Sequence, residues 1–211
     1  MVEMILFDMD GTLWDTVNTT VKAAKIISEK YEDVKEISEE IVTKSMGLGF
    51  SDVAKNYMPY LEKDRREAVL KEIMAKNLEV VKNEGADIYP SVHEVIKKLS
   101  KRYSIGIVTN NFTEYAELFV DTSGLKPYFT DYLGASSLGK SKADAITTIL
   151  KKYNVSKAVY VGDTKGDMES SKEAGVIFIH AKYGFDKTLS TDYQIDNFSE
   201  LMDTIKEIES K

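Results

Sequence analysis

Four aspartates occupy two places in the chain where chemistry is feasible. Asp8 and Asp10 follow one short apolar run, and Asp163 and Asp167 follow another. If these carboxylates share a cavity, they repel one another and raise one another's pKa, so they need either protons or a cation. The chain has no cysteine and only two histidines. Oxygen ligands therefore dominate, which favours a hard ion such as partly hydrated Mg²⁺.

The elements that would position these aspartates follow from the apolar patterning. Four short apolar runs end abruptly in polar residues, as buried strands do where they enter loops. Stretches with apolar residues at helical spacing lie between them. Alternating strands and helices predict an α/β fold, with a doubly wound, mostly parallel, Rossmann-like sheet. Ligands bind beyond the carboxyl ends of such strands, so the polar clusters should converge there. The expected strands are residues 2–7, 104–108, 158–161 and 176–179.

Residues 16–86 have a different character, with long amphipathic segments and no convincing buried strand. A connection of roughly 70 residues far exceeds the usual loop between a strand and a helix. The sequence therefore predicts an all-helical subdomain over 16–86, inserted into an α/β core domain made of residues 1–15 and 87–211. Hinges are expected near Asp15 and near residues 85–89.

Composition excludes several classes of function. The 211 residues carry 28 basic and 35 acidic side chains, a net charge of −7, and 43% are hydrophobic. This length and composition permit one domain, or one with an insertion, and a buried core. A negative net charge gives no positive electrostatic potential that would attract nucleic acid or an anionic membrane. The first residues lack the pattern of a signal peptide or a membrane span, so we expect a soluble, cytoplasmic protein.

Three motifs carry a family resemblance. Residues 8–13 (DMDGTL), 108–110 (VTN) and 162–167 (GDTKGD) resemble, in order and spacing, the signature series of the haloacid dehalogenase (HAD)-like hydrolase superfamily. The phosphoglycolate phosphatase-like branch is the most similar, and the resemblance spans nearly the whole chain. The helical insertion at 16–86 resembles the C1-type cap that this branch inserts after its first strand.

The resemblance implies roles for the four aspartates. Asp8 would be the nucleophile that forms an aspartyl-phosphate. Asp10 would be the general acid toward the leaving oxygen and then the general base toward water. The carboxylates of Asp8 and Asp163 and the backbone carbonyl of Asp10 would bind Mg²⁺. Asp167 would support this metal site, directly or through water.

The resemblance also implies a phosphate-binding set. Thr109 and the amide of Asn110 would bind the phosphoryl oxygens, and a lysine would neutralise charge on the nucleophile and the phosphate. Residues 139–144 (GKSKAD) offer Lys140 and Lys142, of which Lys142 is preferred. Gly47, in the glycine-bearing break at 45–50, either reads the substrate or belongs to a plain helix–helix turn.

The expected activity is therefore Mg²⁺-dependent hydrolysis of a small-molecule phosphomonoester through an aspartyl-phosphate. The expected partner is that soluble ester, with no nucleic acid and no membrane, and the protein is a monomer or a homodimer. Two alternatives stay open. One is a phosphosugar mutase resembling β-phosphoglucomutase, which shares the Asp-x-Asp pair. The other is a catalytically inactive binding protein that keeps the HAD fold.

Overall fold

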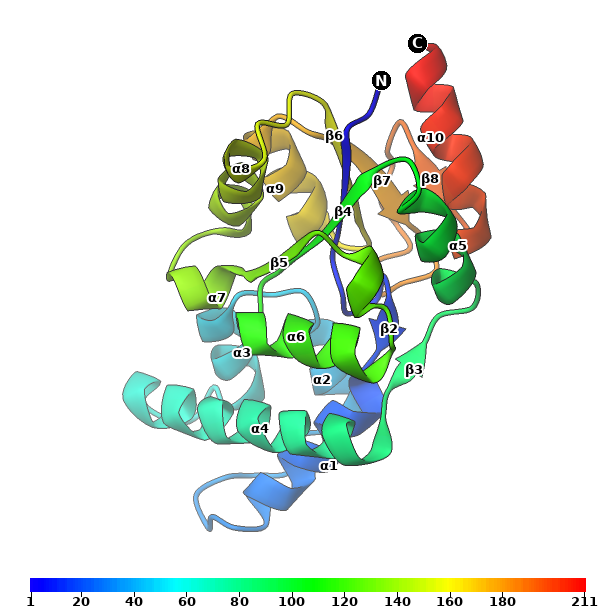
Figure 1. Cartoon of the computed structure of the whole chain (residues 1–211). Coiled ribbons are helices and arrows are strands. Elements are labelled where there is room, and N and C mark those ends of the chain that lie inside the picture. The colour runs from blue at the N-terminus through cyan, green and yellow to red at the C-terminus, as the bar shows by residue number, and fades with distance from the viewer. The chain divides into compact units, whose positions relative to one another are not determined.

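The computed structural model describes all residues from Met1 to Lys211, and the chain folds into two compact units. One unit is Met1–Trp14 together with Ile88–Lys211, and the other is Asp15–Asp87. The second unit extends one residue beyond the predicted 16–86 subdomain at each end. Two paired two-residue strands, β2 (Trp14–Asp15) and β3 (Asp87–Ile88), mark the places where the chain passes between the units (Figure 1).

The first unit contains a six-stranded, fully parallel sheet in the order β5-β4-β1-β6-β7-β8. The sheet confirms the predicted doubly wound α/β fold. The strands are β1 (Met4–Phe7), β4 (Ser104–Thr109), β5 (Asp131–Gly134), β6 (Ala158–Gly162), β7 (Ile177–Ala181) and β8 (Gln194–Ile195). Two of these strands are absent from the sequence prediction. β5 is only partly buried and β8 has two residues, so neither produces a continuous apolar run.

Helices pack on the sheet and complete the core. They are α5 (Val92–Leu99), α6 (Thr113–Thr122), α7 (Ala135–Leu138), α8 (Lys142–Lys152), α9 (Lys165–Ala174) and α10 (Leu201–Ser210), with 3₁₀ turns at Lys126–Tyr128 and Phe198–Glu200. Successive side chains of β1 point to opposite faces. Met4 and Leu6 share a buried cluster with Ile146 of α8, whereas the ring of Phe7 lies 5.8 Å from that of Phe198. A strand buried on both faces is apolar throughout, which is why residues 2–7 were recognisable in the sequence.

The order of the strands places the functional loops together. β1 lies between β4 and β6, and Phe7 is in register with Ile107 on one side and with Val161 on the other. The carboxyl ends of the three central strands therefore reach the same edge of the sheet. From β1, the sheet continues through β4 and β5 on one side and through β6, β7 and β8 on the other. The strand order therefore reverses direction at β1, and open α/β sheets bind ligands at such a switch point.

The second unit is entirely helical apart from its terminal strand residues. Its helices are α1 (Val17–Ser28), α2 (Glu39–Ser45), α3 (Phe50–Tyr57) and α4 (Lys63–Glu84). Helices α1 and α4 bury a small apolar core that includes Ala24, Ile27, Leu70 and Ile73. Ser38 begins α2 by accepting a hydrogen bond from the backbone N–H of Ile41. The buried positions Val69, Leu70 and Ile73 of α4 recur at helical spacing and contribute to this core.

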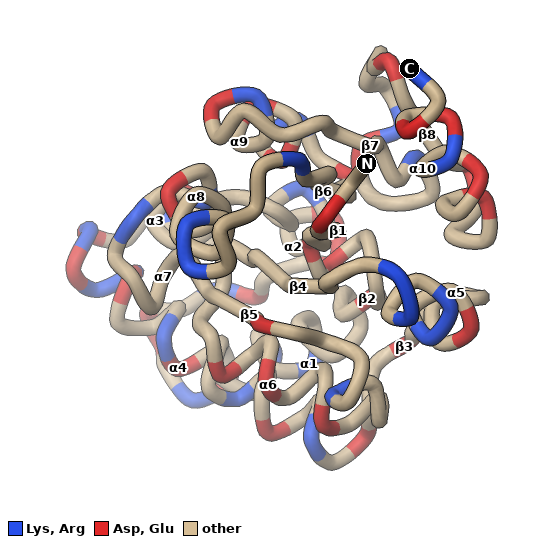
Figure 2. Tube along the Cα trace, turned by 45° about the horizontal axis from the view of Figure 1, so that its top comes forward, with Lys and Arg blue, Asp and Glu red and all other residues tan.

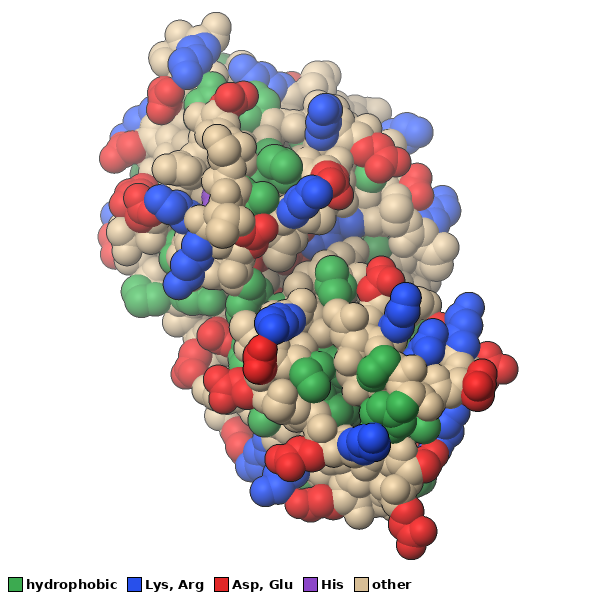
Figure 3. All heavy atoms as spheres, turned by 180° about the vertical axis from the view of Figure 1, so that it is seen from behind, with side chains coloured by type: hydrophobic (Ala, Val, Ile, Leu, Met, Phe, Trp, Pro, Cys, Tyr) green, Lys and Arg blue, Asp and Glu red, His purple; other side chains and the backbone are tan.

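Charged residues lie mainly on the helices, and the central strands are nearly free of them (Figure 2). Lys and Arg side chains alternate with Asp and Glu over the face that Figure 3 shows, without a continuous basic stretch. No helix of the protein combines the length and apolar character that a membrane span requires.

Candidate active site

The loop after β1 carries the first pair of aspartates. Asp8 is buried and Asp10 is half-buried. The chain turns at Gly11, directly after Asp10, and the φ of +82° at this residue favours glycine. A Cβ at Gly11 would lie 2.2 Å from Oδ2 of Asp163, so only glycine permits this approach. The glycine of the DMDGTL motif therefore brings the first loop against the second aspartate pair.

The junction of β6 and α9 carries the second pair of aspartates. Asp163 directly follows β6, and Asp167 lies in the first turn of α9. Thr164 is the N-cap residue of this helix, and its backbone N–H and its hydroxyl donate to Oδ2 of Asp167 over 3.0 and 2.6 Å. This capping box stabilises the start of the helix and fixes one oxygen of Asp167. The four-residue spacing in the third motif is thus a consequence of helix capping.

Both oxygens of Asp163 accept hydrogen bonds. The hydroxyl of Thr12 donates to Oδ1 over 3.3 Å, and the backbone N–H of Phe185 donates to Oδ2 over 2.7 Å. Gly184 permits this contact, since a Cβ there would lie 2.4 Å from the Cβ of Asp163. Thr12 and Phe185 were not identified as site residues, although Thr12 belongs to the first motif, residues 8–13.

Lys142 connects the two aspartate pairs. Its ammonium Nζ lies 2.9 Å from Oδ1 of Asp8 and 2.6 Å from Oδ1 of Asp167, and all three side chains are buried. Lys142 is the first residue of α8, whose N-cap Ser141 forms a capping box with Asp144. Lys140, the other candidate, is exposed and precedes this cap. Only Lys142 therefore contacts the candidate nucleophile.

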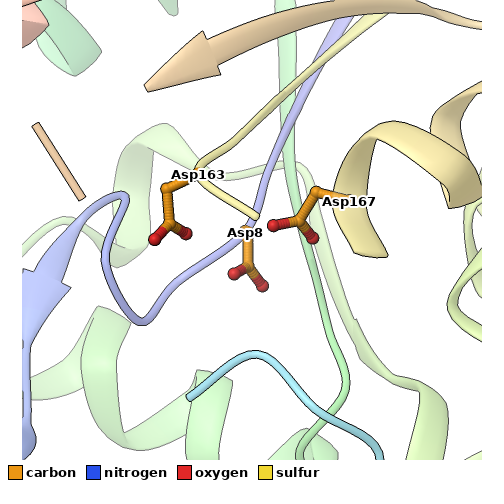
Figure 4. Close-up of side chains that lie close together, drawn as sticks. All are labelled: Asp8, Asp163 and Asp167. Atoms are coloured by element: carbon orange, nitrogen blue, oxygen red, sulfur yellow. The ribbon is translucent and has the colours of Figure 1, made fainter. Parts of the chain in front are cut away.

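The aspartates form a group that fits a divalent cation. Oxygen atoms of Asp8, Asp163 and Asp167 lie within 4.8 Å of one another, and Figure 4 shows Asp8 between the other two. Three carboxylates and one ammonium give a buried charge of −3 + 1 = −2. An uncompensated buried charge is costly, and a hard ion with charge +2 cancels this one with the oxygen ligands that it prefers. The carboxylate of Asp10 lies outside this group, and a metal contact through its backbone carbonyl stays a prediction.

The crowding of negative charge also shifts the pKa values of Asp8, Asp163 and Lys142. Burial, followed by the charge of Asp167, raises the pKa of Asp8 to about 7. The same two causes raise the pKa of Asp163 well above its ordinary value. Burial lowers the pKa of Lys142, but the carboxylates of Asp167 and Asp8 outweigh it and leave this pKa raised. The lysine therefore stays charged, and Asp8 and Asp163 tend to hold protons until a cation replaces them.

The raised pKa values of Asp8 and Asp163 predict a pH-dependent affinity for Mg²⁺. The pKa of Asp8 rises from its ordinary value of 3.8 to about 7 on folding. Between these values the folded metal-free protein holds a proton that the unfolded chain has lost, so this group lowers stability as pH rises. Mg²⁺ binds the deprotonated form and competes with that proton. We expect Mg²⁺ affinity to rise with pH, by about tenfold per pH unit for each carboxyl group that loses a proton on binding, and Asp163, whose pKa is also raised, extends this rise beyond the pKa of Asp8.

Isothermal calorimetry with Mg²⁺ at a series of pH values measures this effect. The stabilisation by Mg²⁺ in thermal melts, taken as the difference between Tm with and without the ion, should follow the same curve. The Asp8→Asn variant is the matched control, because it removes one of the two carboxyl groups with a raised pKa and should make the dependence less steep. An affinity for Mg²⁺ that is constant from pH 5 to about pH 8 would contradict this account of the cluster.

The predicted phosphate-binding residues lie on the neighbouring strand. Thr109 is the last residue of β4 and is buried, and its Oγ1 accepts a hydrogen bond from the backbone N–H of Asn111 over 3.2 Å. Asn110 follows it, half-buried, and its carbonyl accepts a 2.6 Å hydrogen bond from the hydroxyl of Ser136. These bonds hold the loop in a defined conformation at the same edge of the sheet as Asp8.

Gly47 lies in the helical unit, between α2 and α3, with a φ of +78°. The positive φ accounts for a glycine at this turn. The structure thus gathers Asp8, Asp163, Asp167 and Lys142 into one cluster and places Thr109 and Asn110 at the next strand end. A role for Gly47 in reading the substrate stays a prediction.

Three comparisons relate the chain to known proteins. A family model described as haloacid dehalogenase-like hydrolase matches residues 5–181. The chain is 27% identical to a phosphoglycolate phosphatase of Vibrio parahaemolyticus, over 97% of this chain and 96% of that protein. It is 28% identical, over the full length of both chains, to a Clostridium perfringens protein, PpaX, whose name marks it as a candidate pyrophosphatase.

The fold has close relatives among solved structures. A haloacid dehalogenase-like family hydrolase from Streptococcus pneumoniae superposes with a TM-score of 0.85 over 97% of this chain and 98% of that one. Their sequences are 22% identical, so this likeness concerns the fold alone.

Proposed function

This chain belongs to the haloacid dehalogenase-like hydrolase family, and we propose that it is a Mg²⁺-dependent phosphatase of small-molecule phosphomonoesters. The observation that carries the proposal is the buried carboxylate of Asp8, at the end of the central strand, bound by the ammonium of Lys142. Two further buried aspartates complete this group. A carboxylate in this position is oriented by Lys142 and shielded from bulk water, as a nucleophile toward phosphorus requires.

The first step would transfer the phosphoryl group to the enzyme. An oxygen of Asp8 forms a bond to phosphorus while the bond from phosphorus to the ester oxygen breaks. Asp10 donates its proton to that leaving oxygen. Thr109 and the backbone amide of Asn110 donate hydrogen bonds to the phosphoryl oxygens, and Lys142 offsets their developing negative charge.

The second step would release phosphate. Asp10 accepts a proton from a water molecule as the water oxygen forms a bond to phosphorus. The bond between phosphorus and Asp8 then breaks, which returns both aspartates to their starting states. Because Asp10 gains in this step the proton that it lost in the first, one carboxyl group serves as both acid and base.

The metal site would be formed by Asp8, Asp163 and the backbone carbonyl of Asp10. A divalent cation bound there supplies the positive charge that allows a phosphate ester to approach a group whose own charge is −2. Asp167 would support the site mainly through Lys142, since its Oδ1 accepts from that ammonium and its Oδ2 caps α9. Mg²⁺ fits this donor set best because it prefers a few carboxylates and keeps part of its water.

Replacing Asp163 with Asn is expected to weaken Mg²⁺ binding by about 10- to 100-fold, because the variant removes one charged oxygen ligand and keeps the side chain's shape. Turnover should fall at low Mg²⁺ and recover in part as the concentration is raised. Calorimetry and Mg²⁺ titrations of activity measure the two effects. Asp144→Asn is the matched control, because Asp144 is an exposed capping residue of α8. Unchanged Mg²⁺ dependence in Asp163→Asn would remove Asp163 from the metal site.

The substrate class is proposed from the relatives and from the charge of the protein. A phosphoglycolate phosphatase and a candidate pyrophosphatase both resemble the chain, so a small phosphate compound is the shared element. The net charge of −7 disfavours polymeric nucleic acid as a substrate. We therefore place the substrate among small soluble phosphate esters, with the protein acting as a monomer or a homodimer.

Phosphate release from a panel of three phosphate esters and one phosphoric anhydride, pyrophosphate, tests the proposal. The panel contains p-nitrophenyl phosphate, phosphoglycolate, a hexose phosphate and pyrophosphate, each with Mg²⁺ and again with EDTA. We expect Mg²⁺-dependent release of phosphate from at least one ester, abolished by EDTA. Background rates throughout would favour the inactive binding protein instead. Conversion of one hexose phosphate into its isomer without phosphate release would favour the mutase.

A further inference from the structure

Tyr115 contacts the candidate acid–base residue. Its phenolic hydroxyl donates a hydrogen bond to Oδ1 of Asp10 over 3.0 Å. Tyr115 belongs to the first turn of α6, and it is 105 positions away from Asp10 in the sequence. None of the three signature motifs contains it, and in the sequence it reads as one apolar-face residue of an amphipathic helix.

The ring of Tyr115 is held firmly in place. It is 3% exposed, and its centroid lies 5.3 Å from that of Trp14. Trp14 is itself packed edge-on against Phe119, one turn further along α6, at 5.0 Å. The start of α6 is fixed to the sheet by the backbone N–H of Gly134, which donates to the hydroxyl of Thr113. A rigid aromatic cluster thus delivers the hydroxyl to the carboxylate.

We propose that Tyr115 is a positioning residue that orients the carboxyl group of Asp10 for proton transfer. Because the Tyr115 hydroxyl donates to Oδ1, the carboxyl group of Asp10 can rotate only by breaking this hydrogen bond. In this orientation Oδ2 is the oxygen that gives and accepts the proton. Such fixation matters because a misplaced catalytic group loses much of its effect. This inference rests on the proposed phosphatase function and assigns Tyr115 a part in both of its steps.

The two steps respond differently to the leaving group, which separates this role from a structural one. An alkyl alkoxide leaves phosphorus only with a proton from Asp10, whereas p-nitrophenolate leaves without one. The second step needs Asp10 as a base for every substrate. Loss of Tyr115's hydroxyl should therefore slow both steps with an alkyl phosphate, but only the second with p-nitrophenyl phosphate.

Tyr115→Phe removes the hydroxyl and keeps the ring. We expect kcat for an alkyl phosphate to fall by about tenfold, below the roughly 100-fold or more that a general acid–base contributes, with KM nearly unchanged. With p-nitrophenyl phosphate, stopped flow should show a burst of p-nitrophenolate followed by a slowed steady state. Tyr103→Phe is the matched control, since the buried Tyr103 also donates to a carboxylate, that of Glu209, over 3.1 Å.

A double-mutant cycle with Asp10→Asn tests whether Tyr115 acts through Asp10. We expect Tyr115→Phe to have no further effect in the Asp10→Asn background, because the partner of the hydroxyl is already inactive. Wild-type rates in Tyr115→Phe, or losses that multiply in the double variant, would overturn the inference while the phosphatase function stands. A loss of kcat matched by a loss of folded protein in thermal melts would also overturn it. An inactive wild type would instead refute the function, and this inference with it.

Discussion

Asp8→Asn is expected to reduce phosphate release by about 10⁴-fold or more, because removal of a covalent nucleophile leaves only binding and charge stabilisation. The amide is nearly the same size as the carboxyl group, and its oxygen can still accept the hydrogen bond of Lys142. Steady-state release of phosphate from the best ester of the panel measures the loss. The effect should appear in kcat and should persist at saturating Mg²⁺, because Asp8 is also a proposed ligand of the ion and the measurement must separate the two roles.

The control for this variant is stability. Asp8 is buried beside Asp167, whose charge contributes to its raised pKa, so a neutral side chain relieves repulsion as it weakens the pair with Lys142. We expect Tm in the absence of metal to stay near the wild-type value. Activity within about tenfold of wild type in a folded Asp8→Asn protein would exclude Asp8 as the nucleophile.

Asp10→Asn is expected to lower turnover of an alkyl phosphate by about 100- to 10,000-fold, because this variant lacks the acid of the first step and the base of the second. Binding of Mg²⁺ should stay close to that of the wild type. The carboxylate of Asp10 accepts from Tyr115 and lies outside the group formed by the other three aspartates, so only its backbone carbonyl is proposed to touch the ion.

Calorimetry with Mg²⁺ separates this role from that of a metal ligand. Asp163→Asn serves as the comparison, since it should lose Mg²⁺ affinity first and activity as a consequence. If Asp10→Asn instead lost Mg²⁺ affinity as strongly as Asp163→Asn, the carboxylate of Asp10 would be a ligand and its assignment as the acid–base would be wrong.

The sheet was predictable where its strands are buried on both faces. Residues 4–7 form a continuous apolar run that stops at Asp8, and residues 158–161 form another that stops just before Gly162 and Asp163; a parallel sheet explains both features. The same criterion misses β5, whose residues are mostly half-buried, and β8, which is two residues long. Their positions depend on pairing with β4 and β7, and such tertiary contacts leave no local periodicity.

The aspartates of the site were predictable because the strand ends had to converge. Lys142 could be preferred over Lys140 only through a family resemblance, and the structure places only Lys142 in contact with Asp8. The contacts that fix the site were not predictable. Thr12 and Tyr115 reach their carboxylates across 151 and 105 residues, and nothing in their local sequence separates a positioning hydroxyl from an ordinary one.

In the proposed mechanism the phosphoryl group is bound covalently to Asp8 between the two steps. Acid quenching of Asp10→Asn during turnover of p-nitrophenyl phosphate radiolabelled at phosphorus measures this intermediate directly, because p-nitrophenolate leaves without a proton from Asp10 and the slowed second step lets the phosphoryl-enzyme accumulate. We expect label in the peptide that contains Asp8. This label should depend on Mg²⁺ and should be absent from the Asp8→Asn/Asp10→Asn double variant. Turnover without labelled protein, or label on a residue other than Asp8, would contradict it.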